Sequence, residues 1–271
     1  MFAVMHGAIL GDIAGSRFEF SHPAKFKPRQ EELFTPASRY TDDTVMTIAT
    51  KYAVLTHSSY AKAYGLFGRR YKKVGYGPMF LEWLDRRSEK GYNSFGNGSA
   101  MRVSFLGHYY PTLDQVECEA AKSALCTHNH PEGIKGAVCT AGCVFMAAHG
   151  ASKKQILKYV KTFGYHKLQP IWMRRPFEHF DLTCQGSIPL AIRCFLESEN
   201  WEDCIRNVYS VRCDTDTVGA IAGGIADAFF HGTGFDEDKL LRYYLIKPNP
   251  QGNLDTFLYD WAVKDWRKRR I

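Results

Sequence analysis

The sequence lacks the long apolar run and the leader pattern that mark membrane proteins and secreted proteins. Its longest apolar stretch, residues 136–148, is far shorter than the roughly 20 residues that a helix needs to cross a bilayer. The apolar N-terminus has no basic segment before it and contains Asp12, so it is a poor signal peptide. We therefore expect a cytoplasmic protein without membrane insertion.

The eight cysteines include no CxxC pair and no set at metal-ligand spacing. Cys139 and Cys143 lie in an apolar run, where a thiol acts as a small hydrophobic side chain. This usage is typical of a reducing compartment. It argues against a disulfide framework and against a zinc site built from cysteines.

Alternation of apolar and polar residues, which marks a half-buried strand, is also scarce. Apolar residues recur instead at helical spacing after residues 44 and 217, and over 114–126, 132–149, 152–161 and 199–209. No Pro/Ser-rich linker and no low-complexity segment divides the chain. These patterns predict an all-α fold and a single domain over residues 1–271, with a short basic tail at about 264–271.

Four of the charges that make the net charge +7 come from Arg267, Lys268, Arg269 and Arg270 at the extreme C-terminus. A short basic tail is either the solvated end of a last helix or a contact for nucleic acid or anionic lipid. The sequence leaves both readings open.

Glycines recur every fourth residue in two of the expected helices, at Gly7, Gly11 and Gly15 and again at Gly219 and Gly223. Glycine costs about 1 kcal/mol in a helix interior. Rows of glycine on one helix face therefore predict helices whose backbones pack very closely, and we expect these two helices to pack on each other.

Two short acidic motifs, YTDDT (residues 40–44) and CDTDT (213–217), resemble each other although they lie far apart in the chain. Each places two aspartates among threonines, directly before an apolar helical run. Asp and Thr are favoured N-caps, and the helix dipole stabilises acidic groups there. One such residue per helix is enough, so the second carboxylate calls for a cation, and hard divalent cations prefer oxygen ligands of this kind. The spacing leaves helix caps and a metal site open.

Three loops carry further candidate binding groups. SFGNGSAMR (94–102) is a glycine-rich turn whose backbone N–H groups either bind a phosphate or belong to an ordinary loop. THNHPEG (127–133) offers His128 and His130, but no further Cys or His lies nearby at ligand spacing, which argues against zinc. WMRRPF (172–177) is basic and aromatic, and it is either an ordinary surface loop or a contact for an acidic partner.

Six motifs occur together in the order seen in one enzyme family: GAILGDIAGSRFEF, YTDDTVM, SFGNGSAMR, THNHPEGIKGA, CQGSIPLAI and CDTDTVGAIAGGIADAF. Over residues 7–232 the chain resembles the ADP-ribosylglycohydrolase family, which includes the dinitrogenase-reductase-activating glycohydrolases and the ADP-ribosyl-acceptor hydrolases. The resemblance implies a compact multi-helix orthogonal bundle with a binuclear metal cleft. The cofactors that it implies are two divalent cations, Mg²⁺ or Mn²⁺.

The resemblance also implies roles for individual residues. The implied metal ligands, with Asp216 as the bridge, are Thr41, Asp42, Asp43, Asp214, Asp216 and Thr217. The implied substrate-binding residues are Gly96, Asn97, Gly98, Ser99, Ala100 and Met101, whose loop holds the diphosphate through the N–H groups of residues 97–100, and His128, near the adenosine-side ribose. For catalysis, Asp42 or Asp43 is the expected general base. Glu19 matches the family's mobile glutamate and is a rival for the acid or base role.

These roles predict a metal-dependent hydrolase that cleaves the bond between the distal ribose of ADP-ribose and an acceptor. The expected partner is an ADP-ribosylated protein or a small ADP-ribose compound, and a nucleic-acid acceptor is a further candidate. A non-catalytic ADP-ribose-binding relative and a di-metal nucleotide phosphohydrolase stay open as alternatives. Arg212-Cys213 and Phe105 depart from the family pattern, and we expect them to reshape the cleft without removing a ligand.

Overall fold

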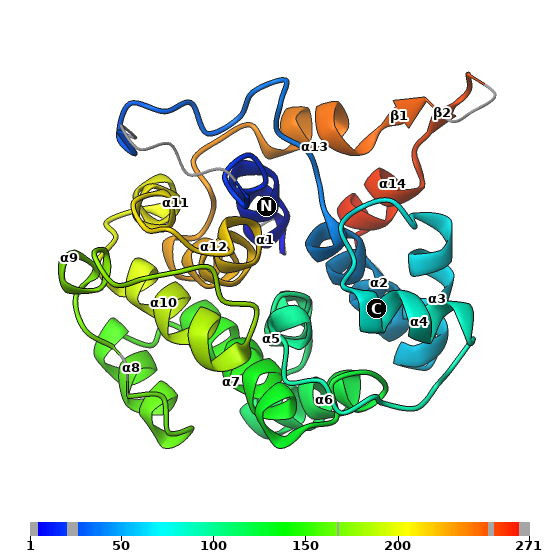
Figure 1. The fold of residues 1–271 in the computed structure, drawn as a ribbon, viewed down its shortest axis with the longest axis horizontal. Coiled ribbons are helices and arrows are strands. Elements are labelled where there is room, and N and C mark those ends of the chain that lie inside the picture. The colour runs from blue at the N-terminus through cyan, green and yellow to red at the C-terminus, as the bar shows by residue number, and fades with distance from the viewer. Residues whose placement is uncertain (1–4, 21–26, 167, 249–251, 266–271) are drawn as a thin grey trace.

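The computed structural model of the chain describes residues 5–20, 27–166, 168–248 and 252–265. This part of the chain is built mainly from helices (Figure 1). Their bounds are α1 His6–Gly15, α2 Asp42–Thr56, α3 Tyr60–Arg70, α4 Pro78–Asp85, η1 Asn97–Ser99, α5 Ser104–Tyr109, α6 Leu113–Leu125, α7 Pro131–Ala148, α8 Lys153–Thr162, α9 Ile171–Arg174, α10 Cys184–Leu196, α11 Trp201–Tyr209, α12 Thr215–Phe230, α13 Glu237–Leu245 and α14 Phe257–Val263.

Helices α1 and α12 lie side by side in the middle of the fold, and almost all of their residues are buried (Figure 1). A Cβ atom built on Gly11 would lie 2.1 Å from the carbonyl oxygen of Gly219, and one on Gly15 would lie 2.1 Å from that of Thr215. The backbones are therefore too close for any side chain at these positions. The predicted close packing of the two glycine-bearing helices is confirmed, and it sets the start of α12 against the end of α1.

The other helices pack around this pair and bury their apolar faces. Helix α7 packs against α5, α6, α10 and α12, while α11 packs against α12 and α1. Helix α2 lies against α1, α3, α5 and α14, so its first turn reaches the same central region. The core consequently surrounds the C-terminal end of α1 and the N-terminal ends of α2 and α12.

The all-α prediction is confirmed. The strands within the described residues are β1 Lys247–Pro248 and β2 Leu254–Asp255, which pair antiparallel. The helices expected over 114–126 and 132–149 appear as α6 and α7, each within one residue of the predicted bounds. For these two helices, helical periodicity was a sufficient guide.

In the part of the chain that the structure describes, no helix combines the length and the apolarity that crossing a bilayer requires. The basic residues 267–270 of the expected tail lie outside the described residues.

Candidate active site

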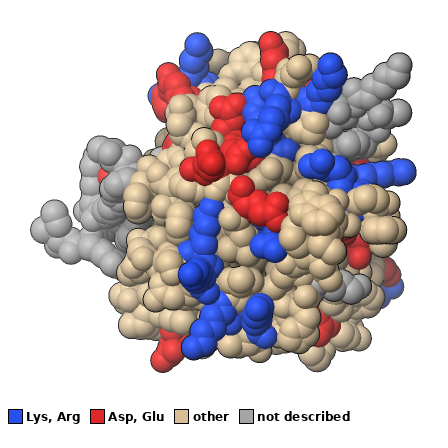
Figure 2. All heavy atoms as spheres, turned by 90° about the vertical axis from the view of Figure 1, so that its left-hand side faces the viewer, with Lys and Arg blue, Asp and Glu red and all other residues tan. Residues whose placement is uncertain are grey.

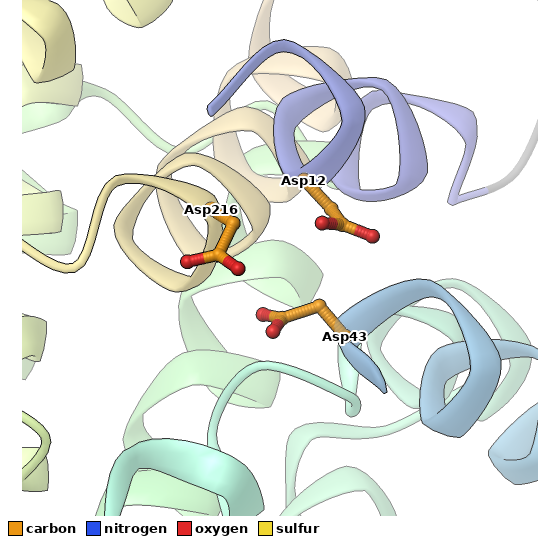
Figure 3. A group of neighbouring side chains, drawn as sticks. All are labelled: Asp12, Asp43 and Asp216. Atoms are coloured by element: carbon orange, nitrogen blue, oxygen red, sulfur yellow. The ribbon is translucent and has the colours of Figure 1, made fainter. Parts of the chain in front are cut away.

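Three helices direct carboxylates toward one point (Figure 3). Asp12 comes from α1, Asp43 from the first turn of α2, and Asp216 from the first turn of α12. One carboxylate oxygen from each residue lies within 4.8 Å of the others. All three residues are buried. The two acidic motifs of the sequence therefore meet at one site, because α1 and α12 pack so closely.

A second group consists of Glu19, Asp214 and Asp216, whose carboxylate oxygens also lie within 4.8 Å of one another. Asp216 belongs to both groups, which suits a bridging carboxylate. Among the described residues, Asp42 belongs to neither group, although it lines the same cavity. Asp42 therefore lies near the predicted centre without being part of its tightest clusters.

Asp12 is a site residue without a role predicted from sequence, although it lies in the motif GAILGDIAGSRFEF. Its Oδ2 accepts hydrogen bonds from the backbone N–H groups of Thr41 and Thr44, both at 3.0 Å. Its Oδ1 accepts from the Thr41 hydroxyl at 2.7 Å, and the Thr44 hydroxyl also donates to Oδ2. Asp12 thus caps α2 from another helix and holds the first turn that carries Asp43. A lone charge inside an apolar helix was the available signal, since a buried carboxylate needs partners.

Other contacts hold the start of α12. Asp214 is its N-cap residue, but the side chain makes no capping hydrogen bond. Instead, Asp214 Oδ2 accepts from Asn97 Nδ2 at 2.7 Å. The Thr217 hydroxyl donates to Asp43 Oδ2 at 3.1 Å, which joins the first turns of α12 and α2. The second motif is therefore tied to the Gly96–Met101 loop and to the first motif, in addition to starting a helix.

The first motif does contain a helix cap, because the Thr41 hydroxyl accepts a hydrogen bond from the N–H of Asp43. A threonine alone serves this purpose. The carboxylates of Asp42 and Asp43 are therefore not needed as side-chain caps.

Burial and mutual repulsion disfavour simultaneous ionisation of these carboxyl groups. The pKa values of Asp42, Asp43 and Asp216 are raised well above the ordinary value. Burial is the largest cause, and the charge of a neighbouring aspartate is the second. Burial likewise raises the pKa of Asp12 and Asp214 to about 6, and burial together with the nearby Asp216 raises the pKa of Glu19 to about 8.

The donor set fits a hard divalent cation. Oδ1 of Asp43 is buried and has no hydrogen-bond partner among the described residues. An orphaned buried oxygen is rare in proteins and calls for an explanation. A cation bound by the oxygen-rich groups would satisfy it and would offset the repulsion between the carboxylates.

The acidic groups open into a cavity of about 540 Å³. Its lining contains both predicted metal ligands and predicted substrate-binding residues, namely Asp42, Asp43, Asp214, Asp216, Thr217, Gly96, Asn97, Gly98, Met101 and His128, together with Glu19. Thr41, Ser99 and Ala100 are buried and do not line it. The structure thus brings most of the sequence candidates together in one concave site.

Two backbone N–H groups of the Gly96–Met101 loop donate hydrogen bonds to carbonyl groups of the protein itself. The N–H of Asn97 donates to the carbonyl of Leu182 at 2.8 Å, and that of Ala100 donates to the carbonyl of Asn97 at 2.8 Å. The expectation that all N–H groups of residues 97–100 face a diphosphate is therefore wrong. Of the other two, Gly98 lines the cavity and its N–H group remains a candidate, whereas Ser99 is buried away from it.

His128 is held by a buried cation and a hydroxyl. Arg102 Nη2 donates to Thr127 Oγ1 at 2.8 Å, and that oxygen lies 2.9 Å from His128 Nδ1. With one lone pair filled by the arginine, the hydroxyl can still donate its proton to Nδ1 or accept the Nδ1 proton through its second lone pair, so this contact allows both tautomers. Burial and the charge of Arg102 hold the pKa of His128 well below the ordinary value. A Cβ on Gly98 would lie 3.0 Å from Nε2, so this nitrogen adjoins the Gly96–Met101 loop.

Other sequence candidates have structural roles. His130 Nδ1 accepts from the N–H of Glu132 at 3.1 Å and thereby caps α7. Phe105 and Cys213 are buried in the hydrophobic core and do not line the cavity. Burial raises the pKa of the Cys213 thiol well above its ordinary value.

A family model described as ADP-ribosylglycohydrolase matches residues 1–240 of the chain. The chain belongs to the ADP-ribosylglycohydrolase family. Two of the relatives that it resembles are proteins named ADP-ribosylhydrolase ARH3. The Homo sapiens protein is 27% identical and the Gallus gallus protein 24% identical, and in each case the match covers 83% of this chain and 83% of the relative.

A solved structure described as an ADP-ribosylglycohydrolase-related protein complex superimposes with a TM-score of 0.70. The match covers 90% of this chain and 91% of that one, at 22% sequence identity, and it shows a shared fold. Family membership supports ADP-ribosyl hydrolase activity in general for this chain.

Proposed function

We propose that this family member hydrolyses the glycosidic bond between the distal ribose of ADP-ribose and a modified acceptor, and that it releases ADP-ribose. The observation that carries the proposal is the cavity shared by the two carboxylate groups and the Gly96–Met101 loop. Its volume falls within the range of small-molecule sites, about 300–1,000 Å³. Clustered buried carboxyl groups with raised pKa values are costly, and such clusters concentrate at catalytic sites.

The proposed cofactors are two divalent cations, Mg²⁺ or Mn²⁺. Their proposed ligands are Thr41, Asp42, Asp43, Asp214, Asp216 and Thr217. We assign Asp12 to positioning and not to ligation, because its two oxygens already accept from four donors. Bound cations of this kind orient hydroxyl groups and lower the pKa of a water molecule.

The carboxyl groups supply the proton chemistry. Glycoside cleavage passes through an oxocarbenium-like state, which nearby carboxylates stabilise. We propose Asp42 or Asp43 as the general base: Asp42 is half-buried at the cavity wall, and Asp43 has the unpartnered oxygen. Glu19, on the same cavity and half-buried, is the other candidate for acid or base work.

The Gly96–Met101 loop and His128 bind the ADP-ribose portion in this proposal. The N–H group of Gly98 provides a donor for the diphosphate without a lysine. Nε2 of His128 adds a polar contact beside Gly98. The side-chain N–H groups of Asn97 are not available to the ligand, because Nδ2 donates to Asp214 and to the Ser187 hydroxyl.

The deciding experiment is a substrate panel assayed with Mg²⁺, with Mn²⁺ and with excess EDTA. The panel contains arginine-linked and serine-linked ADP-ribose on peptides, poly-ADP-ribose and O-acetyl-ADP-ribose. Chromatography should show metal-dependent release of intact ADP-ribose from at least one substrate. Release of AMP would indicate the phosphohydrolase instead, and tight ADP-ribose binding without any hydrolysis would indicate a non-catalytic relative.

A further inference from the structure

A basic and aromatic segment lies close in the chain to two residues that line the candidate active site, Phe180 and Leu182. Residues 151–177 contain seven lysines and arginines but no aspartate or glutamate, in a chain that has 35 basic and 28 acidic residues in all. The described part of this segment forms α8 and α9 and the loops around them. Such a one-sided charge is typical of a surface that meets a polyanion.

Two of the positive charges are used within the fold. Lys153 Nζ donates to the carbonyl oxygens of Leu196 and Ser198 at the end of α10. Arg174 is buried and pairs with Glu178 at 2.6 Å. These two side chains fasten the segment to the protein and do not contribute to an exposed basic surface.

Four other positive charges face solvent: Lys154, Lys158, Lys161 and Arg175. The three lysines lie at positions i, i+4 and i+7, so they share one face of α8. Among the described residues, none of the four takes part in an ion pair. They are therefore available to an anionic ligand.

The same segment exposes large aromatic side chains. Trp172 is 69% exposed and Phe177 is 83% exposed. Exposed apolar groups that gather beside polar ones commonly mark an interaction site. Farther along the chain, Phe180 and Leu182 line the active-site cavity. From Phe177 to Leu182 the backbone spans at most about 17 Å, so a single ligand can reach both the surface and the cavity.

Helices α8 and α9 are anchored to the same part of the fold. Lys153 binds the carbonyl groups at the end of α10, while the N–H of Ile171 donates to Glu197 at 3.1 Å and Arg193 Nε donates to Gln169 at 3.1 Å. Figure 2 looks at this side of the molecule and shows Lys and Arg side chains over its lower half, at the level of α8 in Figure 1. Acidic side chains gather above them. Two acidic neighbours of the segment, Glu178 and Glu197, are already paired with arginines.

We propose that the exposed basic and aromatic side chains of this segment bind single-stranded nucleic acid, and that a strand bearing an ADP-ribosyl group is a substrate class of the cavity that Phe180 and Leu182 line. The second part rests on the proposed hydrolase function. Lysines and arginine match the phosphates, while exposed tryptophan and phenylalanine provide stacking platforms for unpaired bases. A duplex keeps its bases stacked internally, and an acidic peptide supplies the charge without the planar groups.

Binding is tested with an unmodified, dye-labelled 12-nucleotide single strand by fluorescence anisotropy in EDTA, at several salt concentrations. Trp172→Ala should weaken binding at least about fivefold, since stacking contributes a factor of that order or more per base. Replacing Lys158 and Lys161 by Gln together should reduce the slope of log K against log salt by about 1.4, or about 0.7 per phosphate contact. Tyr243→Ala and Lys239→Gln, exposed residues of α13, are the matched controls and should leave binding unchanged.

Absence of binding, or equal losses in the control variants, would overturn the proposal. Equal binding of a duplex without sensitivity to Trp172→Ala would overturn base stacking, and equal competition by poly-glutamate would point to an acidic protein partner instead. The substrate part has its own assay, which compares ADP-ribose release from a modified strand and from a modified peptide. Release from the peptide alone would refute the nucleic-acid substrate and leave the hydrolase standing, whereas release from neither would refute both.

Discussion

Asp12 Oδ2 lies 3.0 Å from the backbone nitrogen of Thr41, so a carboxylate of α1 caps the first turn of α2. The same carboxylate accepts from Thr44, and it lies beside Asp43 and Asp216. The buried side chain of Asp12 therefore joins α2, which carries the first acidic motif, to α1. Helix α1 in turn packs on α12, which carries the second motif. This connection makes stability and activity depend on the same residue.

Replacing Asp12 by Ala should reduce both stability and turnover. The change leaves two backbone N–H groups and two hydroxyls without their acceptor, which we expect to cost about 2–4 kcal/mol. Urea unfolding measures this loss, and ADP-ribose release measures the effect on activity. Asp114→Asn, at an exposed position, should change unfolding by less than about 1 kcal/mol. Equal effects of the two substitutions would contradict the capping role.

Mg²⁺ or Mn²⁺ should stabilise the protein through Asp216, which belongs to both carboxylate groups. At 100 times the dissociation constant, a bound ligand adds about 2.7 kcal/mol per site. Thermal unfolding with and without metal should show this gain in the unaltered protein and lose it in Asp216→Asn. Asp227→Asn, a buried aspartate of the same helix outside the acidic groups, should keep the gain. If the metal still raised the unfolding temperature of Asp216→Asn, the proposed ligand set would be excluded.

Gly11→Ala should destabilise the fold severely, because the new methyl group would lie 2.1 Å from the Gly219 carbonyl oxygen. Separating the two central helices is expected to cost about 3 kcal/mol or more, since the contact is with backbone and not with a flexible side chain. Gly77→Ala is the matched control, because its Cβ would meet nothing within 4 Å. We expect that control to shift the urea midpoint only slightly.

Asp227 should make stability fall as pH rises. Burial, then the charge of Glu237, raises the pKa of Asp227 to about 8, whereas the unfolded carboxyl titrates near its ordinary value. Between these two values the folded state holds a proton that the unfolded state releases, so unfolding becomes easier with increasing pH. Asp227→Asn keeps an acceptor for the Gly7 N–H, which Asp227 binds at 2.9 Å. Urea unfolding from pH 5 to pH 9 should therefore show a shallower decline in the variant, and identical slopes would refute the assignment.

Thr127→Val should disturb His128 without touching the cavity itself. The substitution removes the hydroxyl between Arg102 and His128 Nδ1. Nitrogen NMR should show a changed balance between the two His128 tautomers, and KM for an ADP-ribosylated substrate should rise more than kcat falls. Thr127→Ser, which restores the hydroxyl, should recover both. Unchanged KM in the valine variant would show that the tautomer does not matter for binding.

The helices follow largely from local pattern. Apolar spacing located α6, α7 and α12, because helical periodicity relates residues close in sequence. The glycine rows of α1 and α12 predicted their close contact, because a helix face without side chains lets another backbone approach. The motifs also placed the candidate ligands at helix starts. In these respects the sequence alone was enough.

Only the tertiary structure decided which groups meet. Asp12 lies in the motif GAILGDIAGSRFEF but carried no predicted role, and its four donors come from a helix start about thirty residues away. The pairing of Asp43 with Asp216 and the internal use of the Asn97 and Ala100 N–H groups also depend on packing between distant segments. Local spacing records which side chains are present and which helix face carries them. It does not record which buried acceptor each donor will find, since that depends on how closely α1, α2 and α12 pack.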